Sequence, residues 1–488
     1  MAVRELGSLD PAKASWRGAS AIQAQIFDAL TGLDPATGRV APAAATSWSV
    51  SPDGLTWTFR LRPGAKYHDG APVLAKDFKA AFDRLARKST GADVAFQLEE
   101  IDGFREAHEL GTADALAGVA AVDNATLRIR LREPFAELPY ALSHPRLGPL
   151  QQRRYARALT RLDTVPIGNG PFKVTGVREG TELRLGRFDA YAGGGPAPKI
   201  DELLFRALPS LEEGWRELLD GNIDIADVPP SAGSAATGRE ATVPVWATLA
   251  FGPNLRLEKY ATQAARRGLA LAIDRETIAS TVYNGTKRPA TGILPPGVRA
   301  ARPDLCDVCR LDREGAKRLL GIAYGGRMPE ITIDHLNDPS SRQLAAAVAA
   351  DLGAVGISTK MRAHTRKEYV SFLQAGKQDF AQLGWLADVP TPDGFLAEQL
   401  RTGSPNNQIG FSDARFDTLI KVARKEQDEK LRMARYAAAE VRALELMPLI
   451  PVVFFQNRVG IGARVRGLEI DGAGVFDAST VWLEGGAP

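Results

Sequence analysis

The residues with the clearest capacity for chemistry are the only two cysteines, Cys306 and Cys309, which form a Cys-x-x-Cys pair. Two thiols cannot complete a four-cysteine zinc site. A redox centre would need a thioredoxin-like strand before the pair and a helix opening at the first cysteine, whereas this pair lies in a Pro-rich loop. Three alternatives stay open: a local structural disulfide, which would fit an oxidising compartment, a reduced pair without function, and a redox pair.

Other residue types used in catalysis are dispersed along the chain. There is no Gly-x-Ser-x-Gly elbow, no phosphate loop of the Gly-x-x-x-x-Gly-Lys type and no His-Glu-x-x-His. Acidic pairs such as Glu99-Glu100 and Glu212-Glu213 are expected on helices, where sequence neighbours do not face each other, and therefore as surface charges. We predict no catalytic site, metal or cofactor. The five histidines stand far apart, at His68, His108, His144, His335 and His364.

The composition is that of a folded protein. Apolar residues make up 44% and charged residues 24% of 488 residues, a length that favours two or three lobes over a single core. Lys plus Arg number 61 against 58 for Asp plus Glu, and the signs are interspersed, so no nucleic-acid groove is predicted. The basic pairs Arg153-Arg154 and Arg266-Arg267 are expected on solvated helix faces.

Neither a membrane span nor a secretory signal is visible in this chain. No stretch approaches the ~20 consecutive apolar residues that a spanning helix needs. The N-terminal residues lack a basic segment followed by an apolar run. A trimmed chain or a cytoplasmic protein would both begin this way, and composition does not choose between them.

Hydrophobic periodicity predicts a mixed α and β protein without the internal repeats of a solenoid or propeller. Apolar residues recur at spacings of three and four in five predicted helices, over residues 20–30, 75–85, 263–273, 341–352 and 416–446. Alternating or apolar runs predict strands over 56–61, 126–131, 182–185, 330–333 and 449–454.

Turn and loop residues divide these elements. Ser51-Pro52-Asp53-Gly54, between Trp48 and Trp57, predicts a β-hairpin, because Pro presets φ and Gly supplies a positive φ. The small-residue stretches 193–196 and 229–238 are predicted to be loops and are too short to link independent domains.

The most specific motif runs from Leu61 to Leu85. It contains Pro63-Gly64-Ala65-Lys66-Tyr67-His68-Asp69-Gly70 and then Asp77-Phe78-Lys79-Ala80-Ala81-Phe82. It closely resembles a signature of the oligopeptide- and dipeptide-binding receptors of ABC importers, the family 5 solute-binding proteins. In that family a strand ends in an aromatic-His-Asp-Gly turn, which gives His68 a structural role, and an acidic first turn opens a helix, which Asp77 would supply.

The resemblance continues in sequence order over most of the chain. The further blocks that carry it are residues 7–11, 40–48, 166–172, 220–225, 266–275, 384–388 and 410–417. It implies an α/β fold, a bilobal periplasmic-binding-protein fold of type II in the peptide-binding cluster, with an extra small domain. Lobe I would comprise 1–44, 166–244 and 457–488, the small domain 45–165, and lobe II 245–456. The chain crossings between the lobes would form a hinge that closes over a ligand.

The resemblance also implies how a ligand would bind. In this family an extended peptide pairs its backbone with receptor strands, so that main-chain hydrogen bonds give affinity without side-chain selectivity. The strand would be Gly384 to Leu386, and Asp388 would receive the ligand's α-ammonium. A helix cap or turn carboxylate is the alternative for Asp388. Trp385 would either stack on a ligand side chain or fill the core of the lobe.

Weaker site candidates come from other blocks. The second pairing segment of the family corresponds to Ser15, Trp16 and Arg17. Asn254 would lie beside the cleft or serve only a turn, and Trp246 and Arg256 are further candidates, although Arg256 would equally suit an ion pair between lobes. Three tryptophans, Trp16, Trp246 and Trp385, would also suit a sugar or an amphipathic natural product.

Together these features predict an ABC-importer substrate-binding protein, not an enzyme, that binds a short peptide and delivers it to a membrane permease. We expect a monomer located outside the cytoplasm, periplasmic or as a cell-surface lipoprotein, with its signal segment upstream of this chain. A receptor fold repurposed as an enzyme, a sensor without transport and a periplasmic chaperone are the alternatives.

Overall fold

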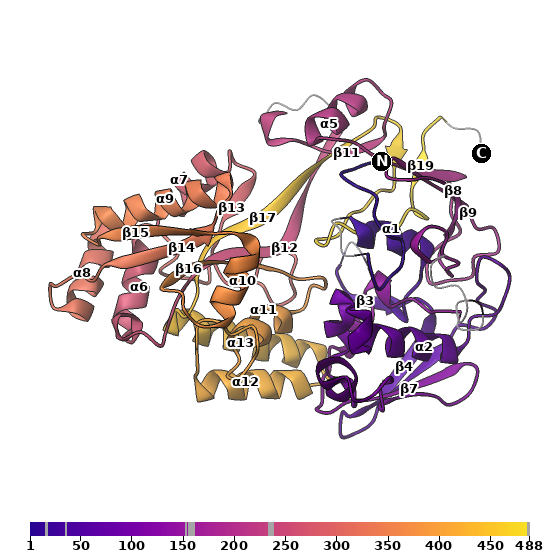
Figure 1. The fold of residues 1–488 in the computed structure, drawn as a ribbon, viewed down its shortest axis with the longest axis horizontal. Helices are drawn as coiled ribbons and strands as arrows, with labels where there is room; N and C mark the ends of the chain where they lie inside the picture. Colours follow the sequence, from indigo (N-terminus) through magenta and orange to yellow (C-terminus); the bar gives the residue numbers. More distant parts are fainter. Residues whose placement is uncertain (15–17, 35–36, 152–153, 155–161, 233–238, 486–488) are drawn as a thin grey trace. The chain divides into compact units, whose positions relative to one another are not determined.

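The computed structural model describes the chain apart from residues 15–17, 35–36, 152–153, 155–161, 233–238 and 486–488. The chain forms two units, one of residues Met1–Val243 with Arg458–Pro488 (unit 1) and one of residues Pro244–Asn457 (unit 2). Strands β12 (Arg239–Pro253) and β17 (Ile450–Ile461) carry the chain between the units (Figure 1). Among the described residues, no helix is both long and apolar enough to cross a membrane.

Unit 1 contains two four-stranded sheets, ordered β1-β10-β9-β8 and β4-β5-β7-β6. Its strands are β1 (Ala2–Val3), β2 (Thr31–Leu33), β3 (Val40–Pro42), β4 (Ala45–Val50), β5 (Thr56–Leu61), β6 (Val119–Ala121), β7 (Thr126–Arg130), β8 (Phe172–Arg178), β9 (Glu182–Arg187), β10 (Glu202–Ala207), β11 (Ile225–Asp227), β18 (Val465–Arg466) and β19 (Trp482–Leu483). Its helices are α1 (Ala19–Ile26), α2 (Ala75–Ala86), η1 (Lys88–Thr90), η2 (Asp93–Leu98), η3 (Arg105–Leu110), α3 (Leu138–Ala141), η4 (Pro145–Leu147), α5 (Leu211–Leu219) and η6 (Pro230–Ala232).

Each sheet of unit 1 has its own apolar core. The β4-β5-β7-β6 sheet packs with α2 around residues such as Phe59, Phe78 and Phe82, which are all fully buried. The β1-β10-β9-β8 sheet packs with α1 around Phe172 and Phe205. The hairpin between β4 and β5 forms at Ser51–Gly54, where Gly54 takes a φ of 74° and its N–H donates to the carbonyl of Ser51.

Unit 2 is built on a sheet ordered β17-β12-β16-β14-β15, in which β14 runs parallel to both β15 and β16. Helix α9 packs on β14 and β15, α6 on α8, and α12 on α13 (Figure 1). Its further strands are β13 (Lys287–Pro289), β14 (Ile331–Leu336), β15 (Thr359–His364) and β16 (Phe380–Leu386). Its helices are η7 (Glu258–Tyr260), α6 (Gln263–Ala272), α7 (Arg275–Thr277), η8 (Ile278–Val282), α8 (Arg313–Tyr324), α9 (Pro339–Ala354), α10 (Arg366–Gln374), α11 (Pro392–Leu400), α12 (Ala414–Lys425) and α13 (Glu429–Leu446).

The His68 turn joins two segments of unit 1 that lie far apart in the sequence. Nδ1 of His68 accepts the N–H of Gly168 at 3.2 Å, and Nε2 lies 3.1 Å from the carbonyl of Gly170. A side chain at Gly168 would place its Cβ 1.9 Å from the carbonyl oxygen of Ile26. Burial lowers the pKa of His68 to about 4, so the ring is neutral at physiological pH.

Asp77 lies in the first turn of helix α2, as predicted. Its carboxylate accepts the backbone N–H of Leu74 at 3.0 Å. One donor that the helix leaves without an internal partner is thereby satisfied, and the negative charge faces the positive end of the helix dipole.

Two helix predictions are wrong in length. The stretch 416–446 is two helices, because Asp428 accepts the N–H of Leu431 and caps the start of α13 after α12 has ended at Lys425. Helix α1 ends at Ile26, and Phe27 already has extended backbone with a φ of −129°.

Two predicted surface charges are buried. Arg266 is 8% exposed, because its guanidinium donates to the carbonyls of Leu446, Tyr260 and Ala261. Glu100 follows η2 in a turn and is 9% exposed. Arg153, of the other basic pair, lies outside the described residues.

Candidate functional site

Strand β16 has one edge that is only partly used. Along its full length, from Phe380 to Leu386, it pairs with β12. On its other side β14 pairs only at Phe380 and Ala381. The pairing stops two residues before β14 ends at Leu336, after which the chain turns into α9. Within the described part of the chain, residues 383–386 therefore have no strand partner on this edge. Backbone N–H and C=O groups on such an edge can pair with another chain.

The side chains of this free edge are unusual for an exposed strand. Leu386 is 64% exposed, Gly384 is exposed, and Trp385 between them is half-buried. The indole Nε1 of Trp385 is buried without a hydrogen-bond partner among the described residues. A side chain at Gly384 would contact only Leu249, at 3.5 Å, so the backbone here is accessible from this face. These three predicted site residues are consecutive on β16, and the structure places all three on its free edge.

Asp388 follows the free edge directly. It is half-buried and lies three residues before Thr391, the N-cap of α11, so it does not occupy the cap position. Its backbone neighbourhood is fixed on both sides, since the N–H of Ala387 donates to the carbonyl of Trp246 at 2.9 Å and the carbonyl of Pro390 accepts the N–H of Arg299 at 3.0 Å. A carboxylate is therefore held close to the end of an open strand edge.

Asn254 and Arg256 lie at the other end of the strand pair. Asn254 is five residues beyond Leu249, the partner of Gly384, which corresponds to about 16 Å of strand. Its amide donates to the carbonyls of Gly376 and Gln378, and its oxygen accepts the N–H of Arg256. Arg256 donates to the carbonyl of Gln408. The structure places both side chains in a turn and does not bring them to the free edge.

Of the remaining predicted residues, Trp246 is described by the structure and offers no exposed aromatic surface. Trp246 is 3% exposed and packs against Gly297, where an added Cβ would lie 3.1 Å from the indole Nε1. Its contribution near the free edge is its backbone carbonyl. Ser15, Trp16 and Arg17 lie outside the described residues.

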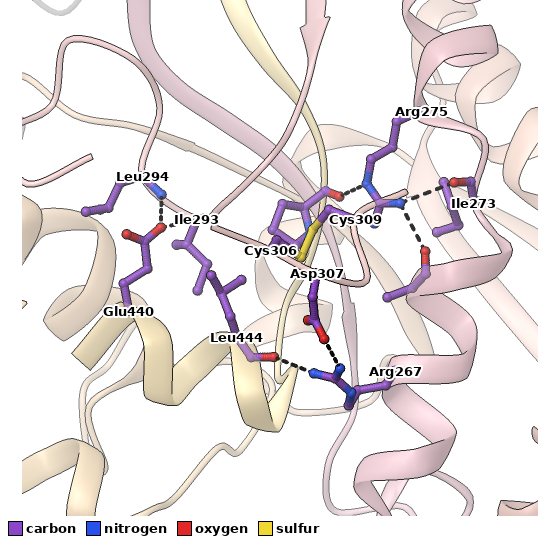
Figure 2. Close-up of a disulfide and its surroundings, with 12 residues drawn as sticks. Arg267, Ile273, Arg275, Ile293, Leu294, Cys306, Asp307, Cys309, Glu440 and Leu444 are labelled. Atoms are coloured by element: carbon purple, nitrogen blue, oxygen red, sulfur yellow. Dashed lines mark hydrogen bonds and ion pairs between the residues drawn. A yellow bond between two sulfur atoms is a disulfide. The ribbon is translucent and has the colours of Figure 1, made fainter. Parts of the chain in front are cut away.

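Residues 290–309 contact β12, the strand that pairs with β16, and no sequence motif apart from the cysteine pair marks them. We call this segment the strap. The hydroxyl of Thr248 on β12 donates to the carbonyl of Ile293 at 2.9 Å. Glu440 of α13 accepts the N–H groups of Ile293 and Leu294, each at 2.9 Å (Figure 2). No motif marks Glu440 in the sequence.

The cysteines lie at the C-terminal end of the strap. Cys306 and Cys309 form a disulfide, the first of the three alternatives that the sequence left open. The N–H of Cys306 donates to the carbonyl of Thr291 at 3.0 Å, so the two ends of the strap meet beside the disulfide. Asp307, between the cysteines, pairs with Arg267 of α6 (Figure 2).

Glu440 is an acid in an environment that favours its neutral form. It is 1% exposed, and its Oε2 has no hydrogen-bond partner among the described residues. Burial raises its pKa to about 7, although the N–H groups of Leu294 and Ile293 and the charge of Arg302 act in the opposite direction. Across the described residues, no group of three or more His, Cys, Asp or Glu side chains is placed to hold a metal ion.

Comparisons with known proteins agree with this architecture. The family model for bacterial extracellular solute-binding proteins, family 5 middle, matches residues 39–407. The dipeptide-binding protein DppE of Bacillus subtilis is 28% identical over 453 residues, which cover 89% of this chain and 82% of that protein. The dipeptide-binding protein of Escherichia coli is 25% identical over 492 residues, covering 94% and 89%. The periplasmic murein tripeptide-binding protein MppA, in its unliganded open form, has a TM-score of 0.88 at 24% identity, covering 99% and 96%.

Proposed function

Since the chain belongs to the bacterial extracellular solute-binding proteins of family 5, we propose that it is a receptor and not an enzyme, and that it captures a short peptide and delivers it to the permease of an ABC importer. Its relatives are named as dipeptide-binding proteins. We further propose that it acts as a monomer outside the cytoplasm.

The free edge of β16 is the observation that carries the peptide proposal. An exposed strand edge bearing an apolar side chain such as Leu386 is a liability that proteins normally cover or charge. An extended peptide is a partner that satisfies it, because its own N–H and C=O groups continue the ladder from Leu383 to Leu386. A sugar could use the same polar groups, but it could not extend a β-ladder.

Asp388 supplies the charged end of this site. A peptide lying along the edge of β16 can bring its α-ammonium close to a carboxylate that follows the strand by two residues. Charge-assisted hydrogen bonds of this kind are stronger than neutral ones and fix the direction in which the peptide lies.

The two units support the proposed division into lobes. The unit boundaries, at 243/244 and 457/458, fall within one residue of those predicted for lobe II, 244/245 and 456/457. The two separate cores of unit 1 favour its division into lobe I and the small domain of residues 45–165.

Native mass spectrometry of the purified protein, before and after mild denaturation, tests the ligand class. We expect a set of short peptides to be released, and an added tripeptide to be recovered chemically unchanged. A single sugar or natural product would overturn the peptide proposal, and a chemically altered tripeptide would overturn the receptor proposal.

Replacing Asp388 with Asn tests the ammonium site. We expect the variant to bind tri-alanine about 30-fold more weakly by calorimetry, because one partner of a charge pair is lost. Binding of N-acetyl-tri-alanine, which has no ammonium, should be the same in both proteins. Glu314→Gln, which removes an exposed carboxylate from α8, is the matched control and should bind tri-alanine as the wild type does. Equal loss for both peptides would contradict the assigned role.

A further inference from the structure

The strap is linked to both flanks of Asp388, through Trp246 on one side and directly on the other. On one side, Gly297 packs against the indole of Trp246, whose carbonyl accepts the N–H of Ala387. On the other side, the N–H of Arg299 donates to the carbonyl of Pro390. Gly297 thus lies beside the residue that holds Ala387, directly before the candidate ligand carboxylate, and Arg299 holds Pro390, two residues after it.

The strap is itself fixed at several points. Glu440 binds it at Ile293 and Leu294, and the N–H of Ala290 donates to the carbonyl of Val452 on β17. The buried guanidinium of Arg299 forms an ion pair with Glu429 at the start of α13. The N–H of Cys306 donates to the carbonyl of Thr291, and the Cys306–Cys309 disulfide lies beside this bond. A segment held at so many points can act as a rigid support, which is what a precisely placed binding group needs.

Gly297 is the point where the support is tightest. Its φ of +90° is a conformation that residues with a Cβ rarely adopt, and an added Cβ would lie 3.1 Å from Nε1 and 3.4 Å from Cδ1 of Trp246. Gly285, before β13, has a similar φ of +70° but nothing within 4 Å of an added Cβ. Alanine at either position would strain the backbone, but only alanine at Gly297 would also displace Trp246. Comparing the two substitutions therefore distinguishes the two effects.

We propose that the strap positions Asp388, so that its conformation sets the affinity for a ligand's ammonium group although no strap residue contacts the ligand. This inference rests on the proposed function of Asp388. The strap residues are positioning residues, and their effect passes through Trp246 and Pro390.

Hydrogen–deuterium exchange of the ligand-free protein tests the positioning independently of any ligand. In Gly297→Ala we expect the amide of Ala387 to exchange at least about tenfold faster, because its bond to Trp246 is displaced. Gly285→Ala should leave this exchange unchanged. If Gly297→Ala does not fold, Glu440→Ala, which removes the acceptor that holds the strap at Ile293 and Leu294, is the second variant and should have the same effect. Unchanged exchange at Ala387 in both variants would overturn the proposal.

Tri-alanine binding tests whether the positioning matters for function. We expect Gly297→Ala to weaken tri-alanine binding about tenfold. Binding of N-acetyl-tri-alanine should be unchanged. Combined with Asp388→Asn, Gly297→Ala should cost no further affinity, because both changes act on one interaction. Additive losses, or equal losses for both peptides, would show general destabilisation and overturn the proposal. If the wild type binds neither peptide while the exchange result holds, the peptide proposal fails and the positioning of Asp388 stands.

Discussion

His68 in unit 1 and Glu440 in unit 2 have the same structural role, although one is a base and the other an acid. Each is a largely buried titratable side chain that hydrogen-bonds two backbone groups of a distant segment. His68 binds Gly168 and Gly170, at least 100 residues away, and Glu440 binds Ile293 and Leu294, at least 146 residues away. Each thereby fixes a loop whose backbone is not part of a β-sheet.

The difference lies in what burial does to each group. Burial favours the neutral form of both, so it lowers the pKa of the base to about 4 and raises the pKa of the acid to about 7. Protonation of His68 would also turn Nδ1 from an acceptor into a donor facing the N–H of Gly168. Unit 1 therefore loses stability from His68 as the solution becomes acidic, and unit 2 loses stability from Glu440 as it becomes alkaline.

Replacing Glu440 with Gln should have the largest effect. The ordinary pKa of Glu, 4.5, applies in the unfolded chain, so the wild type has the full contribution below pH 4.5 and loses it as the pH rises through about 7. Gln cannot ionise, and its oxygen can still accept from Ile293 and Leu294. We expect Glu440→Gln to unfold like the wild type near pH 4.5 and to be more stable by about 3 kcal/mol at pH 8.

Urea denaturation followed by hydrogen–deuterium exchange reports the two units separately and measures this difference. Glu445→Gln, an exposed change one turn further along α13, is the control and should give a curve parallel to the wild type at every pH. A constant difference between Glu440→Gln and the wild type from pH 4.5 to 8 would contradict the assignment.

Replacing His68 with Gln should give the opposite pH dependence. The folded pKa, about 4, lies below the ordinary 6.5, so the wild type has the contribution above pH 6.5 and loses it as the pH falls through 4. As the pH falls from 6.5 to 4, we expect the free energy of unfolding of unit 1 to decrease by about 2 kcal/mol less in His68→Gln than in the wild type. The difference is no larger because the ring of His68 is not fully buried. His108→Gln is the control, and equal acid sensitivity of His68→Gln and the wild type would count against this reading.

His68 and Glu440 also differ in how readily the sequence reveals their roles. His68 stands in a Tyr-His-Asp-Gly turn whose local residues dictate its geometry, and Gly70 adopts the φ of 84° that the turn requires. The same local logic predicts Asp77 in the first turn of α2 and the hairpin at Gly54. The fold could be predicted because these signals, and the resemblance built on them, recur through the chain.

Glu440 could not be found in this way, because its role depends on a segment 146 residues away. On α13 it is one acid among several charged residues, and only the packed structure shows that it faces the strap. Arg266 was misjudged for the same reason, since a helical pattern cannot reveal that a guanidinium reaches the carbonyl of Leu446. The candidate site divides likewise: the strand at Gly384 to Leu386 and Asp388 are implied by the resemblance, whereas the free edge depends on how far β14 pairs with β16.

Removing the disulfide should have the smallest effect of the three changes. The bond closes a loop of only a few residues, so it restricts the unfolded chain little and contributes at most about 2 kcal/mol. We expect Cys306→Ser with Cys309→Ser to lower the free energy of unfolding of unit 2 by that amount at every pH, and the wild type with reductant to behave alike, while unit 1 is unaffected. Because Glu440 holds the other end of the strap, its pH dependence should persist in the double variant. If the loss of the disulfide abolished that dependence, the whole strap would have been released. The disulfide and Glu440 would then stabilise the strap cooperatively and not independently.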